Sequence, residues 1–459
     1  MKKFLLLSVA FIALYLTQVP IAAGQILFNY ALGGDVSDFP SPSVVRTVSD
    51  QKVIASYWDG TNYRLARVGL IDIISAKIDD HHAITDIRIV GDDIFFCGMD
   101  RSNYQAFLGH ATVTGIESMT PHIEIMNFKV DYTTITQLWR LVAYMDPSGT
   151  TTHLVAVGDF WYTNDGVNPP PSGVPSCSPS GTCQSTLAVE YTYTSGIFTL
   201  VDRRVFHDIT GHYEYACDVV ETDNYVAIVT FSAAGELIIH PCSKSNVLAS
   251  LIPPNMYYNY NVPPGLVDPH VCKMKEDTIA VASVFNDGPG TDNMQVRVID
   301  LATMNMHCAQ TFDLLDKDDI YEMAYLPDIQ KLVLLTNHTY TPLTLLIHTF
   351  CFLKPYETAF PYNMEKIYDI NRRSFTSLDR LSTKHIVAAG GDYWIMKDVS
   401  LNNPASTCYK IMNQQVKKLD TSIPLTTSHL FQQTDITSNL IICNETYNHL
   451  TGTFCITNY

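Results

Sequence analysis

The feature that most constrains this chain is a recurring set of eight short, strongly β-prone runs. Each run has about four or five consecutive apolar residues, and a polar turn and a further β-prone segment follow it. Continuous apolar runs of this length suit strands that are buried on both faces. One residue marks each run, and the markers are Val53, Ile94, Leu154, Val226, Ile279, Leu332, Ile386 and Leu440. The last four steps between markers are 53 or 54 residues long, which indicates one repeated structural unit.

A period of this length with several short strands per unit is typical of propeller blades. The sequence therefore predicts an all-β chain that folds as a single β-propeller of eight four-stranded blades, with seven blades as the alternative. Two smaller β-domains or a β-solenoid are the other architectures. A solenoid favours a shorter period, and two domains would show a linker between them. The one proline-rich stretch, residues 168–175, lies inside a repeat and is interpreted as an insertion loop at about residues 162–184.

The two ends of the repeat region favour ring closure. The last unit has three strand candidates and lacks a fourth, whereas residues 25–31 form a strand candidate before the first unit. We therefore expect residues 25–31 to complete the last blade by pairing beside the final strand, near Phe454. Closure of this kind removes exposed sheet edges.

These features together resemble the β-propeller superfamily. With the Lys2-Lys3 start of the chain, they resemble its exported bacterial members. The resemblance covers residues 25–459 as architecture only. The chain has no repeated Gly-His and Trp-Asp pair, no sialidase-type Asp box and no set of kelch double glycines. No functional residue is therefore carried over from a specific family.

The N-terminus has the pattern of a secretory signal peptide. Lys2 and Lys3 precede an apolar segment at residues 4–15, and small residues follow, ending at Gly24. We expect residues 1–24 to be the signal peptide and residues 25–459 to form the propeller domain. The chain is then exported to the periplasm, the cell surface or the medium. No later segment is apolar over 18 residues, so we expect no transmembrane segment in the mature chain.

The net charge limits the classes of partner, and the cysteine content indicates whether disulfide bonds form. The formal net charge of −17 argues against nucleic acid as a partner. Eleven cysteines in an exported chain suggest some disulfide bonds. Cys177 and Cys183 flank a turn-forming segment, and we predict a disulfide between them. Cysteines inside apolar runs, such as Cys97 and Cys443, are interpreted as buried free thiols.

The loops predicted to join second and third strands are rich in aromatic, Asn and Asp residues. Aromatic rings offer flat apolar area and Asn or Asp offers oriented hydrogen bonds, which suits a sugar ring or a protein surface. An equally weighted interpretation is that β-propensity alone places aromatics near strand ends. The candidate ligand-binding residues are Tyr57, Trp58, Asp59, Tyr104, Trp161, Tyr162, Asn286, Asp287, Tyr393 and Trp394.

Histidines occur in the segments that lead into the predicted innermost strands. Three of them, His82, His212 and His270, are weak candidates for metal ligands at the mouth of the axial channel. Their spacing from the following strands varies, so we favour surface-loop histidines and predict neither a metal nor another cofactor. Acidic pairs such as Asp79-Asp80 are explained by turns, and no catalytic residue is assigned.

Three functions are compatible with these observations. We favour an exported, non-catalytic binding scaffold that recognises a glycan or an extracellular protein through its aromatic-rich loop face. The first alternative is a propeller hydrolase or lyase, which predicts converging His, Asp or Glu side chains at the channel mouth. The second is a structural component of a surface assembly, which predicts a sizeable exposed apolar patch.

Overall fold

The computed structural model describes residues 29–32, 44–49, 51–69, 73–130, 134–163, 182–208, 214–232, 236–250, 255–259, 269–288, 291–303, 305–313, 318–340, 345–353, 362–369, 376–380, 385–389, 394–400, 409–416, 418–419, 426–429, 431–435, 440–447, 452–453 and 457–458. The predicted signal peptide, Cys177, His212 and Tyr393 lie outside these residues, as does the insertion loop over residues 164–181.

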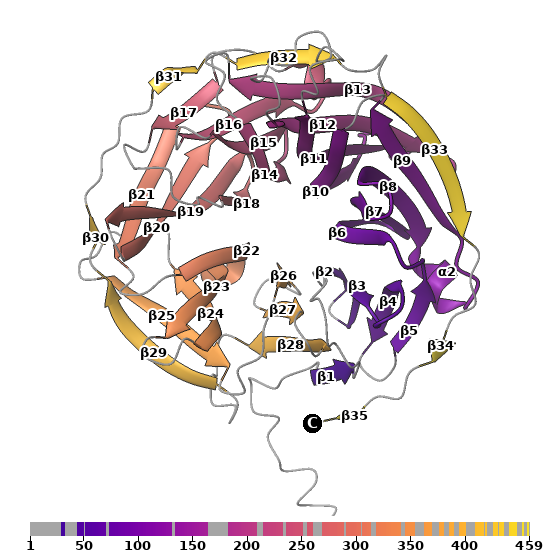
Figure 1. Ribbon diagram of the computed structural model, residues 1–459. Coiled ribbons are helices and arrows are strands. Elements are labelled where there is room, and N and C mark those ends of the chain that lie inside the picture. Colours follow the sequence, from indigo (N-terminus) through magenta and orange to yellow (C-terminus); the bar gives the residue numbers. More distant parts are fainter. Residues whose placement is uncertain are drawn as a thin grey trace, which may run out of the picture.

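The described strands form seven antiparallel sheets of five strands, arranged radially around a central axis (Figure 1). The chain is thus an all-β propeller, as predicted, and each sheet is one blade. Three short helical segments are described, α2 (Val113–Glu117), η1 (Leu248–Ser250) and η2 (Pro327–Ile329). In the described part of the chain, no helix is long and apolar enough to cross a membrane.

The blades are numbered along the chain, and strands are given from the axis outward. Blade 1 contains β2 (Val44–Ser49), β3 (Lys52–Trp58), β4 (Tyr63–Gly69), β5 (Ile73–Lys77) and β34 (Gly452–Thr453). Blade 2 contains β6 (His82–Val90), β7 (Asp93–Asp100), β8 (Gln105–Thr112), β9 (Ile123–Val130) and β33 (Leu440–Tyr447). Blade 3 contains β10 (Thr134–Met145), β11 (Thr152–Thr163), β12 (Thr182–Thr194), β13 (Ile197–Asp208) and β32 (Phe431–Asp435).

The remaining four blades follow the same plan. Blade 4 contains β14 (Glu214–Glu221), β15 (Tyr225–Ser232), β16 (Glu236–Ser243), β17 (Asn255–Asn259) and β31 (Thr426–His429). Blade 5 contains β18 (His270–Lys275), β19 (Thr278–Gly288), β20 (Thr291–Asp300), β21 (Asn305–Asp313) and β30 (Lys418–Leu419). Blade 6 contains β22 (Asp318–Leu326), β23 (Lys331–Tyr340), β24 (Leu345–Leu353), β25 (Tyr362–Asp369) and β29 (Tyr409–Val416). Blade 7 contains β26 (Ser377–Arg380), β27 (His385–Ala389), β28 (Trp394–Ser400), β1 (Asn29–Leu32) and β35 (Thr457–Asn458).

The described strands correct the prediction of eight four-stranded blades to seven five-stranded blades. The first seven sequence markers all lie in the second strand of a blade, in β3, β7, β11, β15, β19, β23 and β27. The eighth, Leu440, lies in β33, which pairs with β9 at the outer edge of blade 2. An apolar run suits an edge strand as well as a middle strand, and the step from Ile386 to Leu440 happens to equal the blade period.

The fifth strands all come from the C-terminal part of the chain. β29 to β34 join blades 6, 5, 4, 3, 2 and 1 in that order, and β35 joins blade 7. In Figure 1 these strands lie around the outside of the ring, and the C-terminal segment visits the blades in the reverse of their order along the chain. Each described outer strand pairs antiparallel with the strand inside it, so the segment covers the edges that four-stranded blades would expose.

Ring closure by the N-terminal strand is confirmed. β1 is the fourth strand of blade 7, with Asn29 opposite Lys397 of β28 and Tyr30 opposite Asn458 of β35. The predicted neighbour, Phe454, lies outside the described residues. Because the first and last parts of the chain share blade 7, separation of the blades requires this sheet to break.

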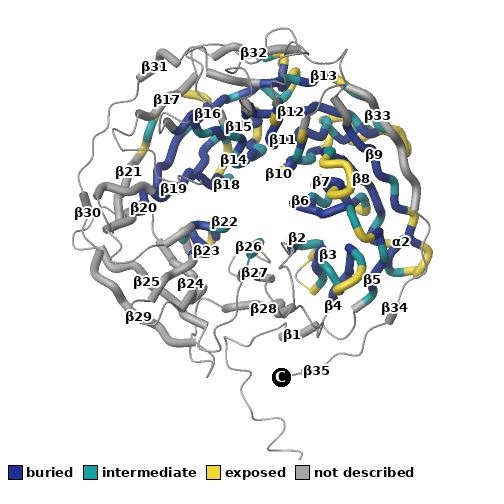
Figure 2. Tube along the Cα trace, viewed as in Figure 1, coloured by how far each residue is buried: buried dark blue, intermediate teal, exposed yellow. Residues whose placement is uncertain are grey.

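The hydrophobic core lies between adjacent blades. The middle strands are buried along nearly their whole length, as in β3, β7 and β15, because each faces a neighbouring blade on both sides (Figure 2). Separate apolar clusters join blades 1 and 2, 2 and 3, 3 and 4, 4 and 5, and 5 and 6. This arrangement explains why the second strands read as continuous apolar runs.

Four innermost strands carry a bulge at the same level, and this irregularity positions the polar groups described below. The strand register shifts just before Asp86 in β6, Arg140 in β10, Asp218 in β14 and Glu322 in β22. In blade 3 a glycine accommodates the bulge: a Cβ at Gly158 would lie 1.8 Å from the Gln137 carbonyl oxygen. Each bulge places one charged residue at the axis.

Candidate functional site

Two polar clusters lie near the axis, and the larger is built from the residues that follow the bulges. Asp86 is fully buried, and its Oδ2 accepts a hydrogen bond from the Leu141 N–H of the next blade at 2.9 Å. Asp218 accepts from the Val271 N–H at 3.0 Å, and Glu322 from the Leu378 N–H at 2.8 Å. Each carboxylate therefore links its own blade to the next one.

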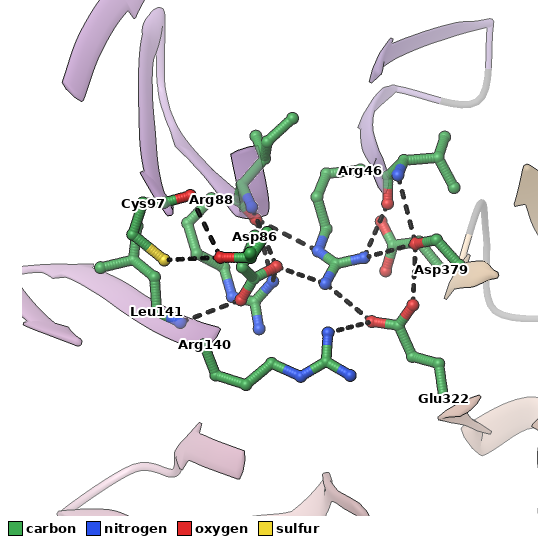
Figure 3. A network of polar contacts seen from close by, with 12 residues as sticks. Arg46, Asp86, Arg88, Cys97, Arg140, Leu141, Glu322 and Asp379 are labelled. Atoms are coloured by element: carbon green, nitrogen blue, oxygen red, sulfur yellow. Dashed lines mark hydrogen bonds and ion pairs between the residues drawn. The ribbon is translucent and has the colours of Figure 1, made fainter. Parts of the chain in front are cut away.

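Two arginines cross the axis and neutralise these carboxylates (Figure 3). Arg46 of blade 1 lies 2.5 Å from Asp86 and 2.7 Å from Glu322, on blades 2 and 6. Arg140 of blade 3 lies 3.7 Å from Asp218 and 3.8 Å from Glu322. Arg140 also donates to the Tyr321 carbonyl oxygen at 3.3 Å. Guanidinium groups thus join blades that are not neighbours in the ring.

The charges of this axial network stabilise one another. Burial raises the pKa of Glu322, but Arg46 and Arg140 outweigh it, so that the pKa of this carboxyl lies below its usual range. Burial alone would lower the pKa of Arg46. The negative charges of Asp86 and Glu322 outweigh this effect, so the pKa of Arg46 lies above its usual value. The carboxylates and arginines of the axial network thus hold the blades together, which is a structural role.

The second cluster lies in blade 3, toward blade 4, and we call it the blade 3 site: Ile135, Trp139, Asp159, Trp161 and Gln184. Trp139 is the extra residue of the β10 bulge, and its indole N–H donates to Asp159 Oδ2 at 2.8 Å. Asp159 is only 6% exposed. Its Oδ1 is buried and has no hydrogen-bond partner within the described part of the chain. Weaker hydrogen-bonding contacts from the Trp161 and Gln184 side chains and the Ala216 backbone favour the charged form, but none of them satisfies Oδ1 with a well-formed hydrogen bond.

Strand alternation explains how these side chains share one face. Trp161 lies two residues beyond Asp159 in β11, opposite Ile135 of β10 and Gln184 of β12. Farther along the same face, Val155, Val157 and Ala188 pack against blade 4. The backbone of Ala216 in blade 4 also lies close to Asp159. The apolar interface between blades 3 and 4 therefore gives way to the blade 3 site near the loop end of the strands.

The blade 3 site combines exposed rings with a buried, incompletely bonded carboxylate. Trp139 and Trp161 are each 37% exposed, and Ile135 is 41% exposed. Burial raises the pKa of Asp159, and the nearby donors offset this only in part. A carboxylate that is buried with one oxygen unbonded is costly for the fold. Such a group is suited to accept hydrogen bonds from a hydroxyl-bearing ligand that lies against the rings.

Tyr104 is a second exposed aromatic residue, in blade 2, and has an unfavourable backbone conformation. It is 53% exposed, in the turn between β7 and β8, with a φ of 55°. Left-handed conformations are uncommon for bulky residues and cost on the order of 1 kcal/mol or more. The Tyr104 carbonyl oxygen accepts a hydrogen bond from the Thr136 N–H, which ties this turn of blade 2 to β10 of blade 3.

The structure separates the predicted ligand-binding residues. Tyr57 and Tyr162 are buried, and Tyr162 belongs to the core between blades 2 and 3. Asp59 accepts hydrogen bonds from the N–H groups of Thr61 and Asn62 and pairs with Arg64, so it shapes its own turn. Trp58 packs against Tyr63.

Tyr104 and Trp161 are exposed, and these two predicted residues remain as candidates for the loop face. The side chains of Asn286, Asp287 and Trp394 lie outside the description, although their backbones belong to β19 and β28.

The histidine candidates are placed in different surroundings. His82 begins β6 and lies against Asp79, whereas His270 begins β18 and lies 3.5 Å from Arg140 in the axial network. Cys183 belongs to β12, its side chain is outside the description, and the predicted disulfide with Cys177 is untested. Cys97 is a buried free thiol, as interpreted from the sequence.

Sequence analysis missed Trp139 and Asp159. Trp139 is the one tryptophan that was not assigned to a loop, because the bulge that exposes it has no clear sequence pattern. Asp159 had a usable signal: it is a charged residue inside the apolar stretch 154–162. A charge in such a run is buried unless the strand ends, and a buried charge is a reason to look for a site.

No protein-family model and no curated protein sequence matches this chain. Among solved structures, the chain is similar to prolyl oligopeptidase B from Galerina marginata bound to a 35mer hydrolysis and macrocyclization substrate, with 10% identity and a TM-score of 0.39. That match covers 83% of this chain and 52% of the other, so this chain spans about half the length of that oligopeptidase.

Two further structures are similar at the same level. NanB with Optactamide has 7% identity and a TM-score of 0.40, over 81% of this chain and 70% of the other. Drosophila Plexin A in complex with Semaphorin 1b has 8% identity and a TM-score of 0.31, over 82% and 87%. Similarities this low carry no conclusion about what this chain binds.

Proposed function

We propose that this protein is an exported, non-catalytic scaffold that binds a glycan at the blade 3 site, on the aromatic face of the propeller. The observation that carries the proposal is the arrangement of Trp139 and Trp161 around Asp159. Two half-exposed indole rings offer flat apolar area to the C–H faces of a sugar, and the carboxylate and the Gln184 amide offer acceptors and a donor to its hydroxyls.

The unbonded oxygen of Asp159 supports binding over a purely structural role. A carboxylate retained for stability would have both oxygens bonded, as those of Asp86 and Asp218 are. Asp159 has one hydrogen bond to an indole and one oxygen without a partner among the described residues. A hydroxyl of a bound ligand would donate the missing hydrogen bond to Asp159 and offset part of the free-energy cost of burying this carboxylate.

The contents of the axis support a non-catalytic role over a channel-mouth enzyme. The converging carboxylates and His270 predicted for a hydrolase or lyase do occur near the axis, but they are bonded to blade backbones and to Arg46 and Arg140. Use of these groups in a reaction would break the contacts that hold the ring together.

A glycan array tests this proposal with the full exported chain. Arrays of neutral and acidic oligosaccharides are probed with the wild type, with Trp161→Ala, and with Ile197→Ala as the matched control. Ile197 is a more exposed apolar position at the opposite end of blade 3, beside the turn into β13.

We expect the wild type and Ile197→Ala to bind the same glycans. Trp161→Ala should bind at least about tenfold more weakly, because it loses the apolar area that an indole buries against a sugar, at about 25 cal/mol per Å². Equal binding by Trp161→Ala would place the site elsewhere. Release of shortened glycan from the array by the wild type would support the hydrolase alternative instead.

A further inference from the structure

A third side-chain cluster lies in the turn between β5 and β6, apart from the axial network and the blade 3 site. Asp79, His81 and His82 bring one carboxylate oxygen and two ring nitrogens within 4.8 Å of one another. His82 Nδ1 lies 2.5 Å from Asp79 Oδ2, and His81 Nε2 lies 3.4 Å from the same oxygen. Two imidazole nitrogens and a carboxylate oxygen are a donor set that Zn²⁺ and similar ions take.

The nitrogen of each ring that faces away from the cluster has an oxygen acceptor of its own. His82 Nε2 lies 3.0 Å from Asn127 Oδ1, which belongs to β9, the fourth strand of blade 2. His81 Nδ1 lies 3.0 Å from Asp80 Oδ1. With an N–H donated to each of these oxygens, loss of the proton between His82 Nδ1 and Asp79 Oδ2 would leave the inner nitrogen of each ring with a lone pair for an ion. Metal-ligating histidines are oriented in this way by carbonyl or carboxylate acceptors.

The carboxylate is held in place as well. Asp79 Oδ1 accepts hydrogen bonds from the backbone N–H groups of His81 at 3.0 Å and His82 at 2.8 Å, which leaves Oδ2 directed at the two rings. The turn itself is fixed from outside, because the Arg101 N–H donates to the His81 carbonyl oxygen at 2.9 Å. The backbone of the turn therefore positions all three donor atoms before any ion is bound.

We propose that Asp79, His81 and His82 bind one divalent transition-metal ion of the Zn²⁺ type. Bond lengths of about 2.1 Å set tetrahedral ligand atoms roughly 3.4 Å apart, which the pair His81 Nε2 and Asp79 Oδ2 already matches. The ion replaces the proton shared between His82 Nδ1 and Asp79 Oδ2, and these two atoms move apart. Three protein ligands leave a coordination position for water or a ligand oxygen, on the side where His81 is partly exposed.

The experiment measures Zn²⁺ binding by titration calorimetry and by native mass spectrometry, with the full chain carrying no polyhistidine tag. His81→Gln is the main variant, because His81 is a partly exposed turn residue and its loss should leave the fold intact. His122→Gln is the matched control, since His122 is an exposed histidine paired with a carboxylate, Glu124, outside the cluster. Asp80→Ala removes the acceptor behind His81 and tests its role.

We expect one Zn²⁺ per chain in the wild type and in His122→Gln, and at least tenfold weaker binding in His81→Gln. Asp80→Ala should weaken binding by about tenfold or more, the usual effect of losing such an acceptor. Co²⁺ bound to the wild type should give the intense visible absorption of a four-coordinate site, and His81→Gln should reduce it. Failure of the wild type to bind Zn²⁺, or equal affinity in His81→Gln, would overturn the proposal and leave Asp79 and His82 as an ion pair that caps the turn.

Discussion

The axial network and the blade 3 site each contain a buried carboxylate next to an inner-strand bulge. The two carboxylates differ in how many of their hydrogen-bonding positions are filled. Asp86 is bonded to two backbone N–H groups and two guanidiniums. Asp159 is bonded to one indole and has an oxygen without a partner in the described chain. The difference indicates that Asp86 serves the fold, whereas the charge of Asp159 costs the fold stability, as we propose for a residue that serves a ligand.

The largest expected effect comes from breaking the axial network. Asp86→Ala leaves Arg46 without one of its carboxylates and removes the contact from blade 2 to Leu141 of blade 3. Removal of one partner from a buried ion pair costs about 3–5 kcal/mol. We expect a loss of this size in urea unfolding of the full chain.

The matched control for Asp86→Ala is Asp223→Ala, which removes an exposed ion pair with Lys273. Exposed pairs contribute about 0–1 kcal/mol, so this variant should unfold close to the wild type. If Asp86→Ala and Asp223→Ala have the same effect, the axial carboxylates do not hold the ring together.

A smaller effect, dependent on pH, is expected for Glu322→Gln. The pKa of Glu322 is lower in the folded chain than its ordinary value of 4.5, so its charge stabilises the fold above that value. This contribution is lost as the pH falls through the folded-state pKa. Unfolding free energies of wild type and Glu322→Gln should therefore differ most at neutral pH and converge in acid. A difference that stays constant between pH 7 and pH 3 would show that the charge is not the cause.

The smallest effect, with the opposite sign, is expected for Asp159→Asn. Burial raises the pKa of Asp159, so the charged form destabilises the fold at neutral pH, and this penalty is relieved as the pH falls through the raised pKa. Asparagine keeps an oxygen acceptor for the Trp139 indole. We expect Asp159→Asn to unfold at an equal or higher free energy than the wild type at pH 7, by up to about 1 kcal/mol.

The advantage of Asp159→Asn should shrink as the pH is lowered, and urea unfolding at several pH values measures it. A loss of more than about 2 kcal/mol at pH 7 would show that the carboxylate belongs to the fold, as the axial carboxylates do.

The inner strands of the blades could be predicted from the sequence, because a strand that is buried on both faces needs a continuous run of apolar residues. Seven of those runs are second strands. The outer strands β29 to β35 could not be predicted, because strand periodicity carries no information about a partner hundreds of residues away, as for Leu440 and Val130. The assumption that every apolar run marks one blade therefore gave one blade too many.

The candidate site shows a similar limit at the level of single side chains. Trp161 and Tyr162 were both predicted to bind a ligand, but successive strand residues point to opposite faces, so only one can be exposed. The structure exposes Trp161 and buries Tyr162. Trp139 depends on a bulge that Gly158 permits, and that requirement is visible only when the two strands are placed side by side.

The measurement that tests the central claim most directly is the affinity of Asp159→Asn for a glycan selected on the array, determined by titration calorimetry at pH 7 beside its unfolding free energy. The claim predicts affinity at least about tenfold weaker than that of the wild type, with stability unchanged or increased, because a charged acceptor contributes about 1.5–3 kcal/mol to a hydrogen bond. Wild-type affinity in Asp159→Asn, or absence of any glycan that the wild type binds, would contradict it.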